Sequence, residues 1–337
     1  MSNSISPRLK SDTSVKLSVI LITSDTFSSI YKTIGYLQKQ TIQADLEIVI
    51  VAPSLSALAL DPTQLAGFVG YRLVEVGKIV SLGRAYASGI RAATYPLIAL
   101  AEDHCFPDAD WAQALVSAHQ RPYAAVGPAL RNANPATAIS WADMLIAYVQ
   151  WLDPAVSQVV DFLPGHNSSY KRDLLLGYGD RLDAMLESET LLHWDLRSRG
   201  YELYLEATAR TAHTNFSQFR PWVHILFRSG RVFGASRAQV EQWSWLKRFA
   251  YAAASPLIPL VRMARILSGL NQGGREHIKL AFGSLPMTLL GLIMDGLGQM
   301  VGYGMGHGDT LQQYADAEFH RELYLAASDK ADLTVSF

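Results

Sequence analysis

The feature that most constrains this chain is an alternation, from about residue 15 to 206, between short apolar runs and stretches with helical spacing. The run VKLSVILI at 15–22 is rich in branched aliphatic residues, residues 27–40 repeat apolar positions at helical intervals, and LEIVIVA at 46–52 is apolar again. This β-α-β order predicts an α/β fold around a largely parallel sheet. The same pattern predicts strands at 71–76, 96–101, 124–126 and 201–207, an extended segment at 159–164, and helices at 82–93, 111–120, 139–151 and 187–199.

Composition and cysteine content limit the class of protein. Apolar residues make up 49% of the 337 residues and charged residues 18%, so a sizeable core can be buried and a disordered chain is excluded. The formal charge of −1 excludes a uniformly basic nucleic-acid binder, and we expect no nucleic-acid partner. A single cysteine, Cys105, excludes an intrachain disulfide, so we expect a cytoplasmic protein.

The chain divides into three predicted parts. Residues 1–14 are polar and Ser-rich and lack the apolar segment of a secretory signal, which predicts a loose tail. Residues 15–217 carry the alternating pattern and form the predicted α/β domain. From 218 to 337 aromatic, Arg-rich helical stretches replace that pattern and predict a helical extension.

Basic charge is concentrated in the predicted extension. Residues 220–279 hold ten Lys or Arg against two Glu, a net charge of +8, and residues 280–294 hold no charged side chain. The positive sign suits anionic lipid headgroups, but the apolar runs are shorter than the roughly 20 residues of a membrane span, and Pro256, Pro259 and Pro286 interrupt them. We therefore expect interfacial helices on the inner face of the cell membrane. The alternative is that these helices bury their apolar faces in a homo-oligomer interface.

Three polar residues, Glu102-Asp103-His104, follow the predicted strand at 96–101. Ligands bind outside the carboxyl ends of the strands in open α/β sheets, and carboxylate and imidazole groups can hold Mg²⁺ or Mn²⁺. The alternative is a solvated turn followed by a helix cap. His213 follows the last predicted strand, where a lone histidine is often structural.

Two further segments could contact a ligand. Arg84 stands near the start of a predicted helix, where it can pair with a phosphate that also takes the helix N-terminal amides; otherwise it is a solvated surface residue. In the turn-like segment at 165–169, Gly165 lets backbone approach a ligand, and Asn167 and Ser168 can donate and accept hydrogen bonds. The alternative for this segment is a helix N-cap.

Glu187 and Glu189 stand at the start of a predicted helix. The helix dipole stabilises carboxylates there, which is a purely structural explanation. A carboxylate that projects from a helix N-terminus into a cleft can also act as a general base toward a hydroxyl group.

The order of these features along about 200 residues resembles the GT-A fold of family 2 glycosyltransferases. In that family, a run of Arg, Gly and Ala precedes an acidic triplet, followed by a Gly-Asn acceptor loop, a Glu-Asp helix, an Arg-x-x-Gly-Tyr strand and a late His. The segments that carry the resemblance are the opening strand at 15–23, LGRAYASGIRAATYPLIALAEDHCFPDADW (82–111), GHNSSYKRDLLLGYGD (165–180) and LESETLLHWDLRSRGYELYLEATARTAHTN (186–215).

The resemblance implies an inverting glycosyltransferase that uses Mn²⁺ or Mg²⁺, takes a nucleoside-diphosphate sugar as donor, and acts on a lipid-linked or cell-surface glycan in polysaccharide biosynthesis. It implies that Glu189 is the catalytic base and that the metal is held by Glu102, His104 and His213. The donor contacts that it implies are Thr23, Ser24, Arg84 and Asp103, and the acceptor contacts are Gly165, His166, Asn167 and Glu187.

Two departures from the family pattern keep other functions open. The second strand ends in VAPS (51–54), where the family places an Asp that contacts the nucleotide base, and the triplet is Glu-Asp-His where three aspartates are usual. A noncatalytic nucleotide-sugar or glycan-binding relative would explain both. A nucleotidyltransferase would need a Gly-rich loop with Arg or Lys after the first strand, and TSDT (23–26) stands there instead.

Overall fold

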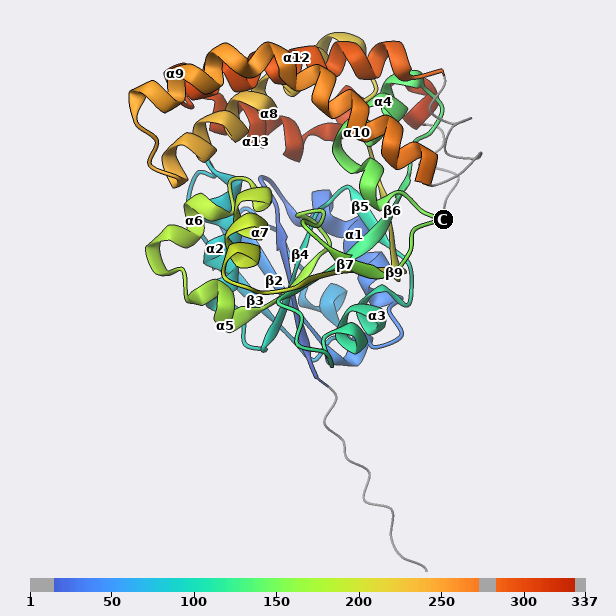
Figure 1. Cartoon of the computed structure of the whole chain (residues 1–337). Helices are drawn as coiled ribbons and strands as arrows, with labels where there is room; N and C mark the ends of the chain where they lie inside the picture. The colour runs from blue at the N-terminus through green and yellow to red at the C-terminus, as the bar shows by residue number, and fades with distance from the viewer. Residues whose placement is uncertain (1–14, 273–282, 331–337) are drawn as a thin grey trace, which may run out of the picture.

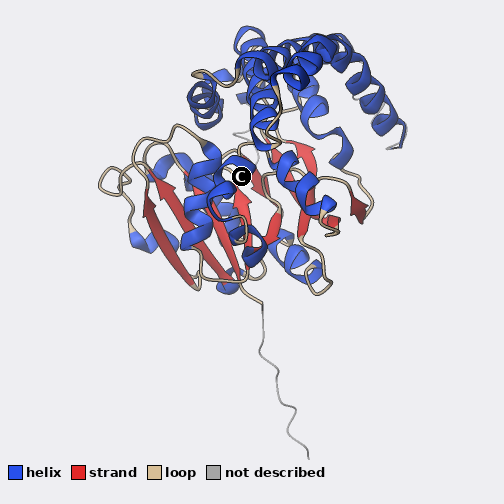
Figure 2. Cartoon of the chain, turned by 60° about the vertical axis from the view of Figure 1, so that its left-hand side comes forward, coloured by secondary structure: helices blue, strands red, loops and turns tan. Residues whose placement is uncertain are grey.

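One mixed sheet organises the first part of the chain. The computed structural model describes residues 15–272 and 283–330, and in these residues nine strands form a sheet of order β3-β2-β1-β4-β8-β6-β9-β5, with β7 also paired to β9. The predicted tail at 1–14 lies outside the described residues. Figure 2 shows the strands side by side with helices around them. The strands are β1 (Leu17–Ile22), β2 (Leu46–Ala52), β3 (Gly70–Glu75), β4 (Leu97–Ala101), β5 (Cys105–Pro107), β6 (Ala125–Asn132), β7 (Gln158–Val160), β8 (Ser169–Lys171) and β9 (Leu203–His213).

The central strands are parallel and buried on both faces, which explains their near-continuous apolar sequence. β1 pairs in parallel with β2 and β4, so Leu17 lies opposite both Leu46 and Leu97. Successive side chains of β1 enter different core clusters: Ile20 packs with residues of α2, and Val19 with residues of α1 and α3. The predicted α/β fold with a mostly parallel sheet is confirmed. These helices are α1 (Phe27–Gln38), α2 (Leu82–Ala92) and α3 (Trp111–Ala118).

The strands that the sequence pattern did not predict are short or irregular. β8 lies antiparallel between β4 and β6, where a turn was expected, and β5 lies antiparallel to β9. Each has three residues, too few to show a period of two. β6 extends to Asn132 and β9 to His213, beyond the predicted ends at 126 and 207, because polar residues and Pro128 obscure the pattern. Their pairing shifts register between Pro128 and Ala129.

After β9 the described chain is helical. Figure 1 shows these helices as a layer over one end of the sheet. Pro256 and Pro259 lie where α9 ends and a 3₁₀ turn leads into α10. Proline interrupts a helix there because it has no backbone N–H to donate. The helices of the layer are α8 (Phe219–Val240), α9 (Trp245–Ala254), α10 (Ile258–Gln272), α12 (Leu285–Met305) and α13 (Thr310–Phe319), with the 3₁₀ turns η5 (Ser255–Leu257) and η6 (Arg321–Tyr324). The remaining helices, which join the strands, are α4 (Ala138–Tyr148), α5 (Arg172–Leu176), α6 (Leu182–Met185) and α7 (Glu189–Ser198).

Glycines let α8 and α12 approach each other at backbone distance. A Cβ atom at Gly230 would collide with the backbone of Asp295, and one at Gly298 or Gly302 would collide with the backbone of α8 at Phe227 or Arg231. The two helices therefore pack as one unit. α4 also packs against α12, which joins the helical layer to the α/β part of the chain.

Candidate functional site

Three side chains from separate segments meet at the end of the sheet below the helical layer. Glu102 comes directly after β4, His213 is the last residue of β9, and His166 lies in the loop before β8. Pairing of β5 with β9 places Cys105 opposite His213 and so draws the segment after β4 toward β9. Glu102 Oε2 lies 3.7 Å from His166 Nδ1 and 3.7 Å from His213 Nε2. One ligand atom from each of the three residues lies within 4.8 Å of the others.

The hydrogen bonding of this cluster fits a metal ion. Both ring nitrogens of His166 are buried and make no hydrogen bond within the described residues, although buried polar atoms normally find a partner, and Glu102 Oε2 lies among the imidazole nitrogens of His104, His166 and His213. His213 Nδ1 lies 3.0 Å from Asn215 Oδ1, and a proton on Nδ1 would leave a lone pair on Nε2, which lies 3.2 Å from the Tyr148 hydroxyl and 3.7 Å from Glu102 Oε2. A divalent cation would satisfy these atoms. Two imidazoles beside a carboxylate favour Mn²⁺ over Mg²⁺, because Mg²⁺ prefers oxygen ligands.

Burial and the neighbouring side chains shift the pKa of each residue in the cluster. Burial lowers the pKa of His166, and burial together with the neighbouring His166 ring lowers the pKa of His213 well below its usual value. Burial alone would raise the pKa of Glu102. The neighbouring His166 and His104 rings outweigh burial and hold that pKa below its ordinary value. A carboxylate and two neutral imidazoles are the forms that bind metal.

His104 stands beside the cluster and is bound to carboxylates. Its Nδ1 lies 2.6 Å from Asp103 Oδ1, and its Nε2 lies 3.2 Å from Glu102 Oε2 and 3.7 Å from Glu318 Oε2. Burial and Arg321 lower the pKa of His104, but Glu102 and Asp103 outweigh them and raise it to about 9. Two of the three predicted metal ligands, Glu102 and His213, are therefore in the cluster, and the third member is His166, which the sequence assigned to acceptor binding.

Glu189, the predicted base, is the first residue of α7 and packs against the loop that carries His166. Its carboxyl group lies so close to Gly165 that any side chain there would collide with it. Burial raises the pKa of Glu189 to about 7. A carboxyl group that titrates near neutral pH is suited to accepting a proton. The loop thus places a candidate metal ligand next in sequence to the residue that contacts the candidate base.

Glu187 occupies a different environment, although the sequence predicts it to contact the acceptor. Its carboxylate accepts hydrogen bonds from the Ser81 hydroxyl and the Gly83 amide at the N-terminus of α2. Burial raises the pKa of Glu187 in spite of these bonds. A side chain at Gly83 would collide with the backbone around Glu187. Glu187 therefore ties α2 to the segment before α7.

The remaining predicted donor and acceptor contacts differ in burial. Thr23 is buried at the end of β1, with its hydroxyl 2.7 Å from Ser29 Oγ, and Ser24 follows it. Arg84 is exposed on α2. Asn167 has a φ of 53° and is buried, and its carbonyl accepts a hydrogen bond of 3.0 Å from Trp111 Nε1.

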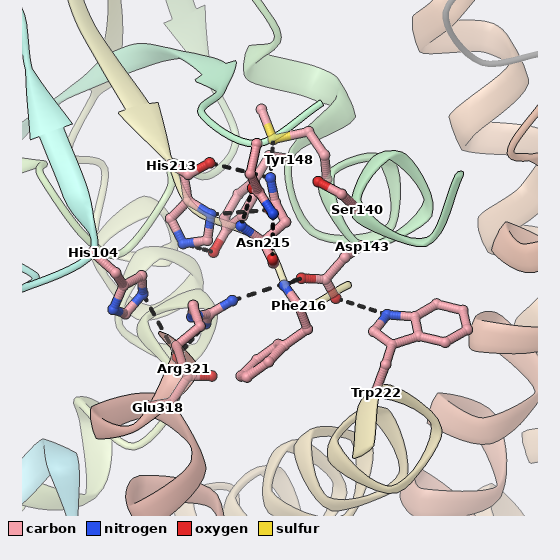
Figure 3. A network of polar contacts seen from close by, with 12 residues as sticks. His104, Ser140, Asp143, Tyr148, His213, Asn215, Phe216, Trp222, Glu318 and Arg321 are labelled. Carbon is pink, nitrogen blue, oxygen red and sulfur yellow. Dashed lines mark hydrogen bonds and ion pairs between the residues drawn. The ribbon is translucent and has the colours of Figure 1, made fainter. Parts of the chain in front are cut away.

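Two residues near the C-terminus reach the site, and sequence reasoning missed them. Figure 3 shows Arg321 between Glu318 and Asp143. Arg321 pairs with Glu318, lies 3.6 Å from Asp143 Oδ2 and has its guanidinium 3.8 Å from the centre of the Phe216 ring. Glu318 in turn lies 3.7 Å from His104. A Glu and an Arg three residues apart are common on helix surfaces, so the sequence offered no signal of this burial.

A cavity of about 1410 Å³ connects the site with the helical layer. On the sheet side Glu102, His166 and Glu189 line it. On the other side basic and apolar residues of the helical layer line it. These include Phe233, Arg237, Tyr251, Leu257, Val261, Arg262 and Arg265. The volume is sufficient for a ligand larger than a drug-sized molecule.

No family model and no curated protein sequence matches this chain. Solved structures resemble it at low sequence identity. GalNAc-T7 with UDP, GalNAc and Mn²⁺ is 13% identical with a TM-score of 0.47, over 60% of this chain and 44% of that chain. The mannosyltransferase PcManGT from Pyrobaculum calidifontis with GDP-Man and Mn²⁺ is 14% identical with a TM-score of 0.49, over 84% and 86%. TarS from S. aureus with UDP is 11% identical with a TM-score of 0.43, over 85% and 90%.

Proposed function

We propose that this protein is a metal-dependent glycosyltransferase of the family 2 type, which moves a sugar from a nucleoside-diphosphate sugar to an acceptor hydroxyl with inversion. The observation that carries the proposal is the convergence of Glu102, His166 and His213, in which neither ring nitrogen of His166 has a hydrogen-bond partner, next to a cavity that Glu102, His166 and Glu189 line. The order of the sequence motifs supports the same reaction.

In this proposal Glu102, His166 and His213 would hold Mn²⁺ or Mg²⁺, which supplies Lewis-acid stabilisation of the negative charge on a departing diphosphate. Glu189 accepts the proton of the acceptor hydroxyl. The acceptor oxygen forms its bond to the anomeric carbon as the bond from that carbon to the diphosphate oxygen breaks, and the electron pair leaves with the diphosphate. Gly165 leaves the space that the Glu189 carboxylate occupies.

The proposal predicts which ligands stabilise the protein. A thermal-shift screen of nucleoside-diphosphate sugars should find at least one that raises Tm with Mn²⁺ and has little effect in excess chelator, because ligands that bind the native state stabilise it by mass action. A transfer assay with the radiolabelled form of that donor then tests catalysis. Stabilisation with neither transfer nor hydrolysis of the donor would instead indicate a noncatalytic nucleotide-sugar-binding protein, and no stabilisation by any donor would contradict the proposal.

A further inference from the structure

The outer helices of the helical layer expose large apolar side chains. No residue of α9 is buried, and Trp245, Phe249 and Leu260 on α9 and α10 have exposed fractions of 74%, 69% and 64%. Figure 1 shows α9 and α12 on the side of the layer that faces away from the sheet. Soluble monomers rarely expose apolar groups of this size together.

Some of the exposed apolar side chains recur at helical intervals and so share one face of their helix. On α9, Trp245, Phe249 and Ala253 recur every four residues, and on α10, Leu260, Ala264 and Leu267 follow at steps of four and three. On α12, which packs against both helices, exposed apolar residues recur every four residues. We call this set the outer apolar face. Its members are Trp245, Phe249, Ala253, Leu260, Ala264 and Leu267 on α9 and α10, and Leu289, Ile293 and Leu297 on α12.

The charge within α9, η5 and α10 has one sign, and Glu241, just before α9, pairs with Lys247 at 3.3 Å. The 28 residues from 245 to 272 contain four basic side chains and no acidic one. Lys247 and Arg265 are exposed. A twofold contact with a second copy would bring these cations together without acidic partners from the same segment, which is unfavourable. An anionic lipid surface offers complementary charge, and aromatic and aliphatic side chains at an interface can enter its headgroup region.

α12 does not fit a membrane-spanning role in this fold. By length and composition it is a candidate span among the described helices, but 44% of its most apolar window is buried inside the protein. Its glycines hold it against the α8 backbone, and its buried Asp295 pairs with Arg262. Spanning would require α12 to give up these contacts.

We propose that the outer apolar face docks on an anionic lipid bilayer, with the exposed sides of α9, α10 and α12 lying in the interface. Residues 273–279, the last part of the predicted basic segment at 220–279, lie outside the described residues and are not needed for this surface.

Vesicle flotation with the full chain tests the proposal. The protein should float with vesicles that contain phosphatidylglycerol at low salt and much less with phosphatidylcholine alone. The Trp245→Ser/Phe249→Ser variant, and independently Leu260→Ser, should reduce the bound fraction, the double variant by about tenfold in partition coefficient. Val156→Ser, which changes an apolar residue that is 73% exposed in a loop outside the face, should bind like the wild type.

Three results would overturn the proposal. The first is no flotation of the wild type with phosphatidylglycerol vesicles. The second is equal flotation of folded variants and wild type. The third is a wild type that does not bind vesicles and forms a stable oligomer in light scattering, when the Trp245→Ser/Phe249→Ser variant is monomeric. That result would assign the face to a second copy. None of these results depends on transferase activity.

Discussion

Glu189 and Glu187 stand two residues apart and occupy different surroundings. Both line the cavity, but Glu189 lies against Gly165, whereas Glu187 is bonded to the N-terminus of α2. Loss of a general base costs about 100-fold to 10,000-fold in rate. Glu189→Gln should therefore nearly abolish transfer and leave donor affinity close to that of the wild type, and Glu187→Gln should be milder because Gln can still accept the Ser81 hydrogen bond. Steady-state rates with a donor found by thermal shift measure this difference.

If Glu187→Gln loses transfer and Glu189→Gln keeps most of it, the catalytic base is Glu187. If both variants keep most of their turnover, the base is another group. Circular dichroism of each variant shows that a lost rate is not lost folding.

The raised pKa of Glu189 also predicts a pH-dependent stability. The native carboxyl group titrates near 7 and the unfolded one near 4.5, so between these values the native state binds more protons and its stability falls as pH rises. Above pH 7 the cost of ionising the buried group is fully present, and below 4.5 it is absent. Glu189→Gln removes this cost. Relative to its effect at pH 4.5, it should stabilise the protein at pH 8 by up to about 3 kcal/mol.

Urea unfolding of both proteins at pH 4.5 and 8 gives the two free-energy differences. A variant that is stabilised equally at both pH values, or not at all, would show that the Glu189 pKa is not raised in the native state.

The sequence predicted part of the cluster. Glu102 was identified as a candidate ligand because it follows an apolar strand, and ligands bind at the carboxyl ends of parallel strands. His213 was assigned to the metal only through the resemblance to family 2 glycosyltransferases. His166 lies in a Gly- and Ser-rich loop before a three-residue strand, and the pattern does not show which way such a loop turns its ring. Its role depends on the antiparallel β8, which the sequence did not reveal.

At the scale of elements, the longer and more deeply buried strands and helices were the ones that the sequence predicted correctly. The buried parallel strands β1, β2 and β4 and the helices α1 and α2 were predicted within a few residues, because branched aliphatic runs and helical periodicity are strong local signals. β5 and β8 gain their pairing from neighbours far along the chain, and three residues carry no period. The C-terminal helices were expected, but how they pack was not.

Glycine packing between α8 and α12 yields a matched pair of variants. A methyl group at Gly298 would collide with the α8 backbone, whereas one at Gly304 of the same helix would meet no atom within 4 Å. Gly298→Ala should lower the free energy of unfolding by about 1 to 3 kcal/mol, since overpacking forces the helices apart. Gly304→Ala should be neutral or stabilising by up to about 1 kcal/mol, because Ala favours helix over Gly. Chemical denaturation followed by circular dichroism compares them, and equal effects would contradict the close contact.

At the scale of the whole molecule, the end of the described chain returns to the site. Backbone amides of Ser217 and Gln218 donate to the carbonyl of Tyr324, and Asp329 accepts the amide of Ala136 and the hydroxyl of Thr137 at the start of α4. These contacts join segments more than 100 residues apart. They place Glu318 and Arg321 beside His104 and Asp143, a result of tertiary packing that no local pattern encodes.

The central claim is that Glu102, His166 and His213 together hold a divalent metal. Isothermal titration of Mn²⁺ into the metal-free protein, with and without UDP or GDP, tests it most directly. We expect one binding site in the wild type, a loss of affinity of about 100-fold or more in His166→Ala, a smaller loss in His104→Ala, and no change in His224→Ala, which alters an exposed histidine on α8. Mn²⁺ affinity in His166→Ala equal to that of the wild type, or no Mn²⁺ binding by the wild type with either nucleotide, would contradict the account.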